Sequence, residues 1–130
     1  MKLLFLKPLT LVALKLKEQT PERIRILPRL SLPVLQAVMN RVRLVIAMDS
    51  LPLHLAGTTS TPTFSVFGAS SMQKYKPLGG IHHGLQGECP YNVSFEKRCA
   101  RLRSCKTGAC IRSLTGKQVM DALTRHSVFS

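Results

Sequence analysis

The residues with the clearest chemistry are an aspartate, a serine and a histidine that follow an apolar run. Asp49 and Ser50 come directly after Met48, and His54 lies four residues beyond Ser50. Because Pro52 is tolerated in the first turn of a helix, the segment predicts a strand followed at once by a helix. The free N–H groups at such a helix start, together with the helix dipole, attract phosphate.

The next apolar run is also followed by residues of interest, a segment of small residues that contains Gly68 and Ser70. In an open parallel sheet, ligands bind beyond the carboxyl ends of the strands. Two such strand ends therefore predict a nucleotide-phosphate site around Asp49, Ser50 and His54. Simpler interpretations stay open, in which Asp49 or Ser50 only caps the helix, His54 is a hydrogen-bonded packing residue and Gly68 is a turn residue.

Four cysteines occupy a tract of 22 positions: Cys89, Cys99, Cys105 and Cys110. Zinc knuckles usually place two to four residues between paired cysteines, and the last pair comes closest to this spacing. We expect reduced thiols, with a structural zinc and disulfides as alternatives. His82 and His83 are near enough in sequence to join a metal site, but a solvated loop is their expected setting. Five basic residues around the cysteines would lower the pKa of the thiols: Lys97, Arg98, Arg101, Arg103 and Lys106.

The elements that would position these side chains alternate between strand and helix. Strands are expected at residues 23–27, 43–48 and 63–67, and helices at residues 32–41, 52–56 and 115–125. The order predicts right-handed βαβ units and an α/β fold, a Rossmann-like doubly wound parallel sheet. Residues 69–108 are expected to be irregular.

The sequence also predicts which side chains of these strands and helices are buried and which residue caps the last helix. The apolar run at 43–48 is typical of a strand covered on both faces. Periodicity predicts that apolar side chains of the two longer helices face inward: Leu32, Leu35, Val38, Met39, Val119, Met120 and Leu123. Thr115 is expected to cap the last helix.

Length and charge limit the classes of function. The 130 residues, 45% of them hydrophobic, fit one packed domain and exclude a disordered chain. The net charge of +13 predicts an anionic partner. Nucleic acid is not the expected partner, because aromatic residues are not interleaved with the basic ones as stacking platforms.

The N-terminal segment differs from the rest of the chain. Residues 1–21 begin with leucines interrupted by Lys7, Pro8 and Lys15, which favours an amphipathic helix or its remnant over a secretory signal. This run is too short and too charged to span a bilayer. We therefore expect a cytoplasmic protein with one domain at residues 22–130, including a cysteine-containing loop at 84–112.

The run from Leu27 to Pro77 resembles the C-terminal domain of glycosyltransferase family nine, the lipopolysaccharide heptosyltransferases. Residues 45–50 (VIAMDS) followed by residues 54–56 (HLA) are similar to the family motif D-[ST]-G-x-x-H-L-x-A. Residues 61–63 (TPT) and 66–68 (VFG) resemble the segment on the following strand. The combination is fairly specific, and the resemblance extends over roughly residues 22–125.

This resemblance implies the C-terminal half of a GT-B fold that binds an ADP-activated heptose for transfer to the lipopolysaccharide core. It implies no metal or cofactor for transfer, and an acceptor at the membrane surface, so the protein could be peripheral to the inner membrane. By the resemblance, Asp49 orients the sugar or diphosphate, Ser50 and the following amides hold the diphosphate with His54 nearby, and Leu30 lines the adenine pocket. Gly68 and Ser70 would be loop contacts.

Two departures from the family pattern affect this interpretation. Leu51 stands where the family has glycine, and its side chain could block close approach to phosphate. The domain that carries the general base in the family has no counterpart in the sequence, so no catalytic residue is expected in this chain. We expect no transfer by the chain alone, whether it is a gene fragment, a mis-started frame or one partner of a split enzyme. The alternative function is a basic, zinc-containing nucleic-acid-binding module.

Overall fold

The computed structural model describes residues 3–5, 15 and 18–126, which fall into two compact units, residues 1–35 and 36–130. In the first unit, β1 (Leu3–Phe5) pairs in parallel with β2 (Ile24–Ile26). A helix was expected at residues 3–5, where the structure has a strand. The rest of the predicted N-terminal helix lies mostly outside the described residues. Leu30 follows β2 in this unit and is half-buried.

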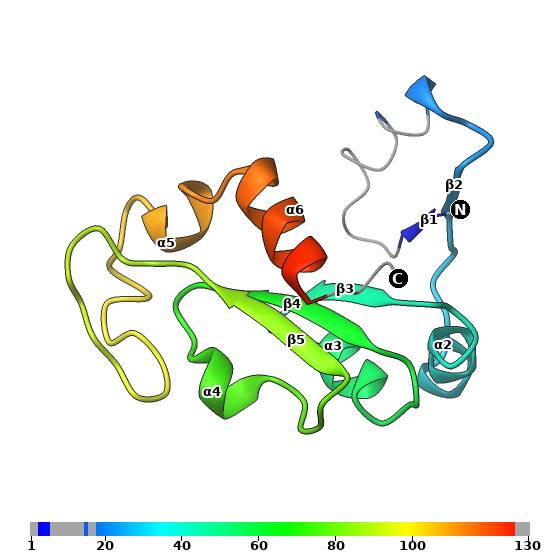
Figure 1. Cartoon of the computed structure of the whole chain (residues 1–130), viewed down its shortest axis with the longest axis horizontal. Coiled ribbons are helices and arrows are strands. Elements are labelled where there is room, and N and C mark those ends of the chain that lie inside the picture. The colour runs from blue at the N-terminus through cyan, green and yellow to red at the C-terminus, as the bar shows by residue number, and fades with distance from the viewer. Residues whose placement is uncertain (1–2, 6–14, 16–17, 127–130) are drawn as a thin grey trace. The chain divides into compact units, whose positions relative to one another are not determined.

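The second unit contains a parallel sheet of three strands in the order β3-β4-β5 (Figure 1). The strands are β3 (Val45–Met48), β4 (Thr63–Phe67) and β5 (His82–Gln86), and the helices of this unit are α3 (Leu51–Ala56), α4 (Met72–Tyr75), α5 (Ala109–Arg112) and α6 (Gly116–Arg125). Helices α3 and α4 connect successive strands and lie on one face of the sheet, while α6 covers the other face. An α/β, Rossmann-like fold is thereby confirmed. The helix α2 (Leu32–Met39) spans the boundary of the two units.

Strand β4 forms the centre of the core. Phe64 packs with Ala122 and Leu123 of α6, while Thr63 and Ser65 point to the opposite face and are also buried. Their hydroxyl groups are satisfied, since Thr63 Oγ1 lies 2.9 Å from His82 Nδ1 and Ser65 Oγ donates to a β5 carbonyl at 3.3 Å. Buried polar groups cost little when they are paired in this way, so β4 can be covered on both faces.

Strand β3 lies at one edge of this sheet. The sequence predicted that the run at 43–48 would be covered on both faces, but Ile46 and Met48 are 53% and 46% exposed. The prediction was wrong because β3 pairs with β4 along one edge and alternates between half-buried and exposed side chains. The strand that is buried on both faces is β4, which was predicted as a strand but whose burial was hidden by its threonine and serine.

Two further expectations about the helices and loops are wrong, and one, on the cap of α6, is confirmed. Residues 69–108 are not irregular throughout, since they contain α4 and β5. Met120 and Leu32 are 52% and 51% exposed, although both were expected to face inward. Thr115 caps α6 as predicted, because its hydroxyl accepts from the backbone of Gln118 while the Gln118 side chain accepts from the Thr115 N–H.

Candidate functional site

The structure brings Asp49 and His54 together at the carboxyl end of β3. One turn of α3 separates them, and His54 Nε2 lies 3.2 Å from Asp49 Oδ1. The Asp49 side chain is only 14% exposed, whereas the His54 side chain is 48% exposed. The pair therefore places a sheltered carboxylate beside an imidazole that reaches solvent.

Ser50 is the N-cap residue of α3, but its side chain does not cap the helix. Its hydroxyl donates to the Met48 carbonyl at 3.1 Å. The Ser50 carbonyl accepts from the amides of Leu53 and His54 at 3.1 and 3.3 Å. Pro52 has no N–H, and the amides of Leu53 and His54 are already bonded to the Ser50 carbonyl, so this helix start offers few free amides to a phosphate.

Leu51 occupies the position at which the family that the chain resembles has glycine, and the backbone there accommodates a leucine. Its side chain is 61% exposed. Among the described residues, the non-glycine residue with a positive φ is Asn92, so the backbone at Leu51 does not require glycine. The leucine is therefore an exposed apolar side chain at the start of α3 that causes no backbone strain.

Gly68 directly follows β4, the strand that pairs with β3. It is buried, and a Cβ placed on it would lie 2.4 Å from Cγ1 of Ile111 and 3.1 Å from Sγ of Cys110. Such distances are too short for real contacts, so Gly68 provides the space in which α5 packs against the sheet. It is more than a turn residue.

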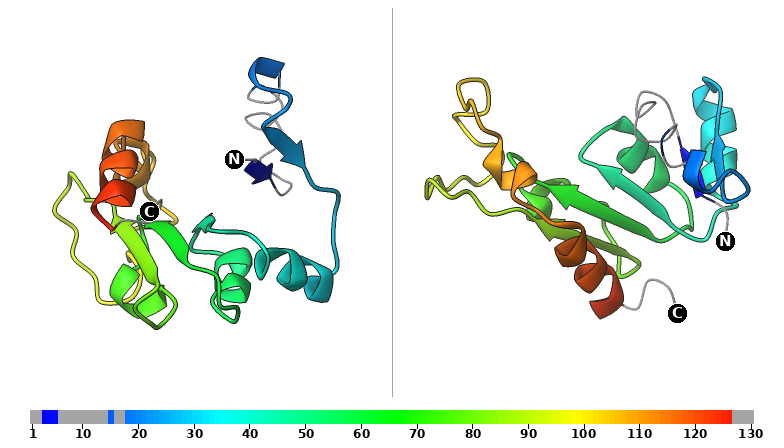
Figure 2. Two further views of the ribbon diagram at one scale, coloured as in Figure 1. Left: turned by 45° about the vertical axis from the view of Figure 1, so that its right-hand side comes forward. Right: turned by 90° about the horizontal axis from the view of Figure 1, so that it is seen from above.

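The segment after Gly68 is paired with the cysteine-containing loop. Ser70 forms an antiparallel bridge with Arg98, and the Cys99 amide donates to the Ala69 carbonyl at 2.6 Å. Arg98 also lies over the Tyr75 ring, 5.1 Å from its centroid. Figure 2 shows the loop beyond the arrowheads of β4 and β5. The predicted loop contacts Gly68 and Ser70 are thus covered by the later part of the chain.

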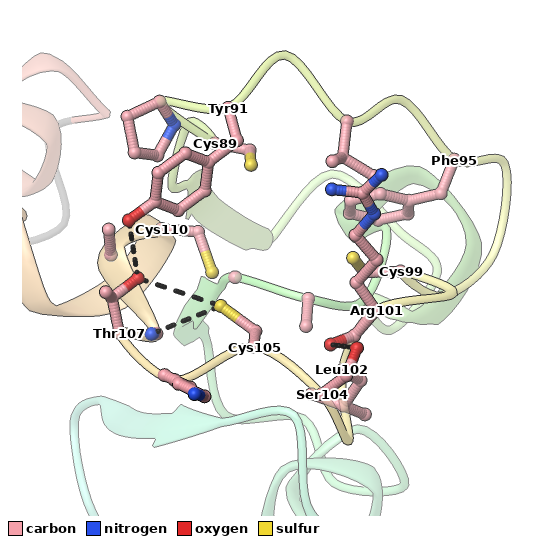
Figure 3. A pocket seen from close by; sticks show the side chains of 17 residues that line it. Cys89, Tyr91, Phe95, Cys99, Arg101, Leu102, Ser104, Cys105, Thr107 and Cys110 are labelled. Atoms are coloured by element: carbon pink, nitrogen blue, oxygen red, sulfur yellow. Dashed lines mark hydrogen bonds between the residues drawn. The ribbon is translucent and has the colours of Figure 1, made fainter.

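All four cysteines line one cavity in this loop, with a volume of about 460 Å³. Its wall includes Gly68, Tyr91, Phe95 and Arg101 (Figure 3). In the described part of the chain, no group of three or more histidine, cysteine or acidic residues is arranged to hold a metal ion. The four cysteines therefore line one cavity without forming a group of this kind. The cavity was not predicted from the sequence, because residues far apart in the chain line it, from Gly68 to Cys110.

Cys105 has a thiol pKa below its usual value. The main cause is the backbone N–H of Gly108, which donates to Sγ at 3.4 Å, followed by contacts with the backbone and hydroxyl of Thr107. The direction agrees with the sequence prediction, but the cause does not, since the prediction relied on nearby lysines and arginines. Amide groups aimed at the sulfur stabilise the thiolate directly.

His82 and His83 lie on β5, so a solvated loop was the wrong setting for them. Burial is the main cause that lowers the pKa of both imidazoles, and Lys76 contributes to each. His82 bonds Thr63 in the core, and His83 stacks on His126 with 4.4 Å between ring centroids. Because both histidines are engaged in contacts within the fold, we assign them a structural role.

A family model described as glycosyltransferase family 9 (heptosyltransferase) matches residues 10–103. The chain is 34% identical over 59 residues to lipopolysaccharide heptosyltransferase 3 of Escherichia coli, an alignment that covers 45% of this chain and 17% of that protein. No solved structure matches. Among the helices of the described residues, none has both the length and the hydropathy of a membrane-spanning segment.

Proposed function

The chain belongs to glycosyltransferase family 9, the heptosyltransferase family, and we propose that its second unit binds the nucleotide-sugar donor, an ADP-activated sugar. The observation that carries the proposal is the Asp49–His54 pair at the carboxyl end of β3. Ligands of parallel α/β sheets bind beyond these strand ends. The Asp49–His54 pair lies at such a strand end, in a chain of the heptosyltransferase family.

The chemistry of the pair suits a sugar diphosphate. One oxygen of the Asp49 carboxylate faces His54 Nε2, and a carboxylate has further lone pairs to accept hydrogen bonds from sugar hydroxyls. The aspartate is sheltered, so its hydrogen bonds are stronger than those of a fully solvated carboxylate. The half-exposed imidazole of His54 is available to a diphosphate oxygen, and the net charge of +13 favours an anionic donor.

Transfer itself is expected to need more than this chain. We infer a GT-B enzyme in which the acceptor, a lipopolysaccharide core sugar at the membrane surface, is held by residues outside the aligned segment. That segment covers 17% of the heptosyltransferase relative. Proton removal from the acceptor requires a base within hydrogen-bonding reach. Asp49, already paired with His54, is assigned to donor binding, and transfer by this mechanism uses no metal or cofactor.

Calorimetric titration of the chain with ADP and with ADP-glucose tests the proposal. Asp49→Asn keeps the side-chain shape and removes the charge, so it should weaken ADP-glucose binding about ten-fold or more, as expected when a charge-assisted hydrogen bond is lost. His54→Gln should weaken binding of both nucleotides.

Asp121→Asn is the matched control, because Asp121 is an exposed aspartate of α6 paired with Lys117 at 2.7 Å. It should leave both affinities unchanged. The proposal fails if neither nucleotide binds at millimolar concentration, or if Asp49→Asn and Asp121→Asn have equal effects.

A further inference from the structure

Donor binding by Asp49 and His54 makes no use of the cysteines, although all four line one cavity beyond the end of β4. Figure 3 shows the sulfur atoms of Cys89, Cys105 and Cys110 facing the space enclosed by the loop. All four are free thiols, and none is fully buried. A small molecule that enters the cavity therefore meets several thiols together.

Cys105 differs from the other three in its surroundings. It is exposed, its Sγ accepts from the Gly108 N–H at 3.4 Å, and it lies 3.7 Å from the hydroxyl of Thr107. Gly108 adopts a left-handed conformation, with φ of 58°, which suits glycine in the turn that forms this contact. Hydrogen bonds to the sulfur favour the thiolate, which is the attacking form in thiol–disulfide exchange.

Cys110 is the second residue of α5 and follows Gly108 by two positions. Two residues of chain span at most about 7 Å, so Cys110 stays close to the amide that contacts the Cys105 sulfur. Its place is fixed by packing: its sulfur lies against Gly68, and its carbonyl lies where a side chain on Gly87 would have to be. Cys110 is thus a half-buried thiol in the wall of the same cavity as the more exposed Cys105.

We propose that Cys105 and Cys110 form a thiol–disulfide exchange site that takes a low-molecular-weight disulfide as its co-reactant. The Cys105 thiolate attacks one sulfur of the disulfide, forms a mixed disulfide and expels one thiolate. Cys110 then loses its proton to solvent and attacks Cys105 Sγ, which expels the second thiolate. Two protein thiols are oxidised, the small disulfide is reduced to two thiols, and a protein disulfide closes the short loop between α5 and residue 105. The site does not depend on donor binding.

Peptide mapping tests this assignment sharply because trypsin separates all four cysteines. Cleavage after lysine and arginine places Cys99 in residues 99–101, Cys105 in residues 104–106 and Cys110 in residues 107–112, while Cys89 lies on a longer peptide that ends at Lys97. The reduced chain is freed of metal with a chelator, exposed to glutathione disulfide, alkylated and digested without reduction. The expected product is a disulfide between the peptides of residues 104–106 and 107–112.

Two variants separate the two steps. Cys110→Ser should stop the reaction at a glutathione adduct on Cys105, and Cys105→Ser should prevent the disulfide altogether. Cys99→Ser is the control and should leave the product unchanged. Linkage of Cys105 to Cys89 or Cys99, or an adduct that forms on Cys99 as fast as on Cys105, would overturn the assignment.

A third variant tests the reactivity of Cys105 without removing a thiol. Thr107→Val takes away the hydroxyl beside the sulfur and should slow mixed-disulfide formation at Cys105 several-fold. Tyr91→Phe is its control, because the Tyr91 hydroxyl bonds the same threonine at 2.9 Å without contacting the sulfur. Equal rates for Thr107→Val and the wild-type chain would show that the threonine does not activate Cys105, and would count against the proposal.

Discussion

Replacing Gly68 by alanine tests whether the end of β4 is closed by α5. A Cβ on Gly68 would lie 2.4 Å from Cγ1 and 2.7 Å from Cδ1 of Ile111. Both distances are far inside van der Waals contact, so either Ile111 leaves its position or α5 moves away from the sheet. Overpacking of this kind costs about 1–3 kcal/mol. We expect Gly68→Ala to lower the free energy of unfolding by that amount.

A double-mutant cycle identifies the cause of the loss. Ile111→Ala removes both clashing carbons, and because Ile111 is half-buried its own cost should lie near the lower end of the core range, about 2 kcal/mol. With Ile111→Ala in place, Gly68→Ala should cost much less than it does alone. The coupling energy is then about 1–2 kcal/mol, within the range seen for residues in contact.

Urea unfolding followed by far-ultraviolet circular dichroism suits the measurement, because the chain has no tryptophan for fluorescence. The m-value should stay constant across the four proteins, so that midpoint shifts report stability. The packing argument is refuted if Gly68→Ala is neutral, or if the two substitutions add to within about 0.5 kcal/mol.

Three further predictions use the same assay. Thr115→Ala removes the capping box of α6 and should cost about 0.5–2 kcal/mol, while an unchanged midpoint would show that the cap adds nothing. Gly87→Ala should destabilise strongly because its Cβ would overlap the Cys110 carbonyl, whereas Gly116→Ala, with no neighbour within 4 Å, should be neutral or slightly stabilising. Burial lowers the pKa values of His82 and His83 from the usual 6.5, so the unfolded chain binds more protons than the folded chain near that pH. The free energy of unfolding should therefore fall as the pH drops below about 6.5. The variant His83→Gln should make this fall shallower.

The sequence predicted the elements that have strong local signals. The strand before Asp49, the helix start at Pro52 and the strand before Gly68 are all present, and the capping threonine of α6 is in place. Each of these signals comes from residues adjacent in the chain. They were sufficient to locate the carboxyl end of β3 and the two side chains that meet there.

Elements without an apolar run were missed. Strand β5 has the sequence HHGLQ, in which histidine and glutamine hide its strand character, and its burial comes from contacts with distant residues. His82 is satisfied by Thr63, Gln86 accepts from the Met72 amide at 2.8 Å, and Gly84 leaves space for the Met72 sulfur. These partners are 12 or more residues away, and a local pattern contains no information about them.

The carboxyl ends of β3 and β4 also differ, and local sequence patterns did not show this difference because it depends on residues that are far apart in the chain. The rule that ligands bind beyond parallel strand ends treats the ends of β3 and β4 alike. Packing separates them, because Gly68 and Gly87 allow α5 and the cysteine-containing loop to close over β4. The end of β3 keeps a polar pair, with His54 half-exposed. Under the proposed function, the donor reaches the sheet beside β3. The end of β4 borders the cavity that the four cysteines line, so substitutions at Asp49 and at Cys105 should act independently.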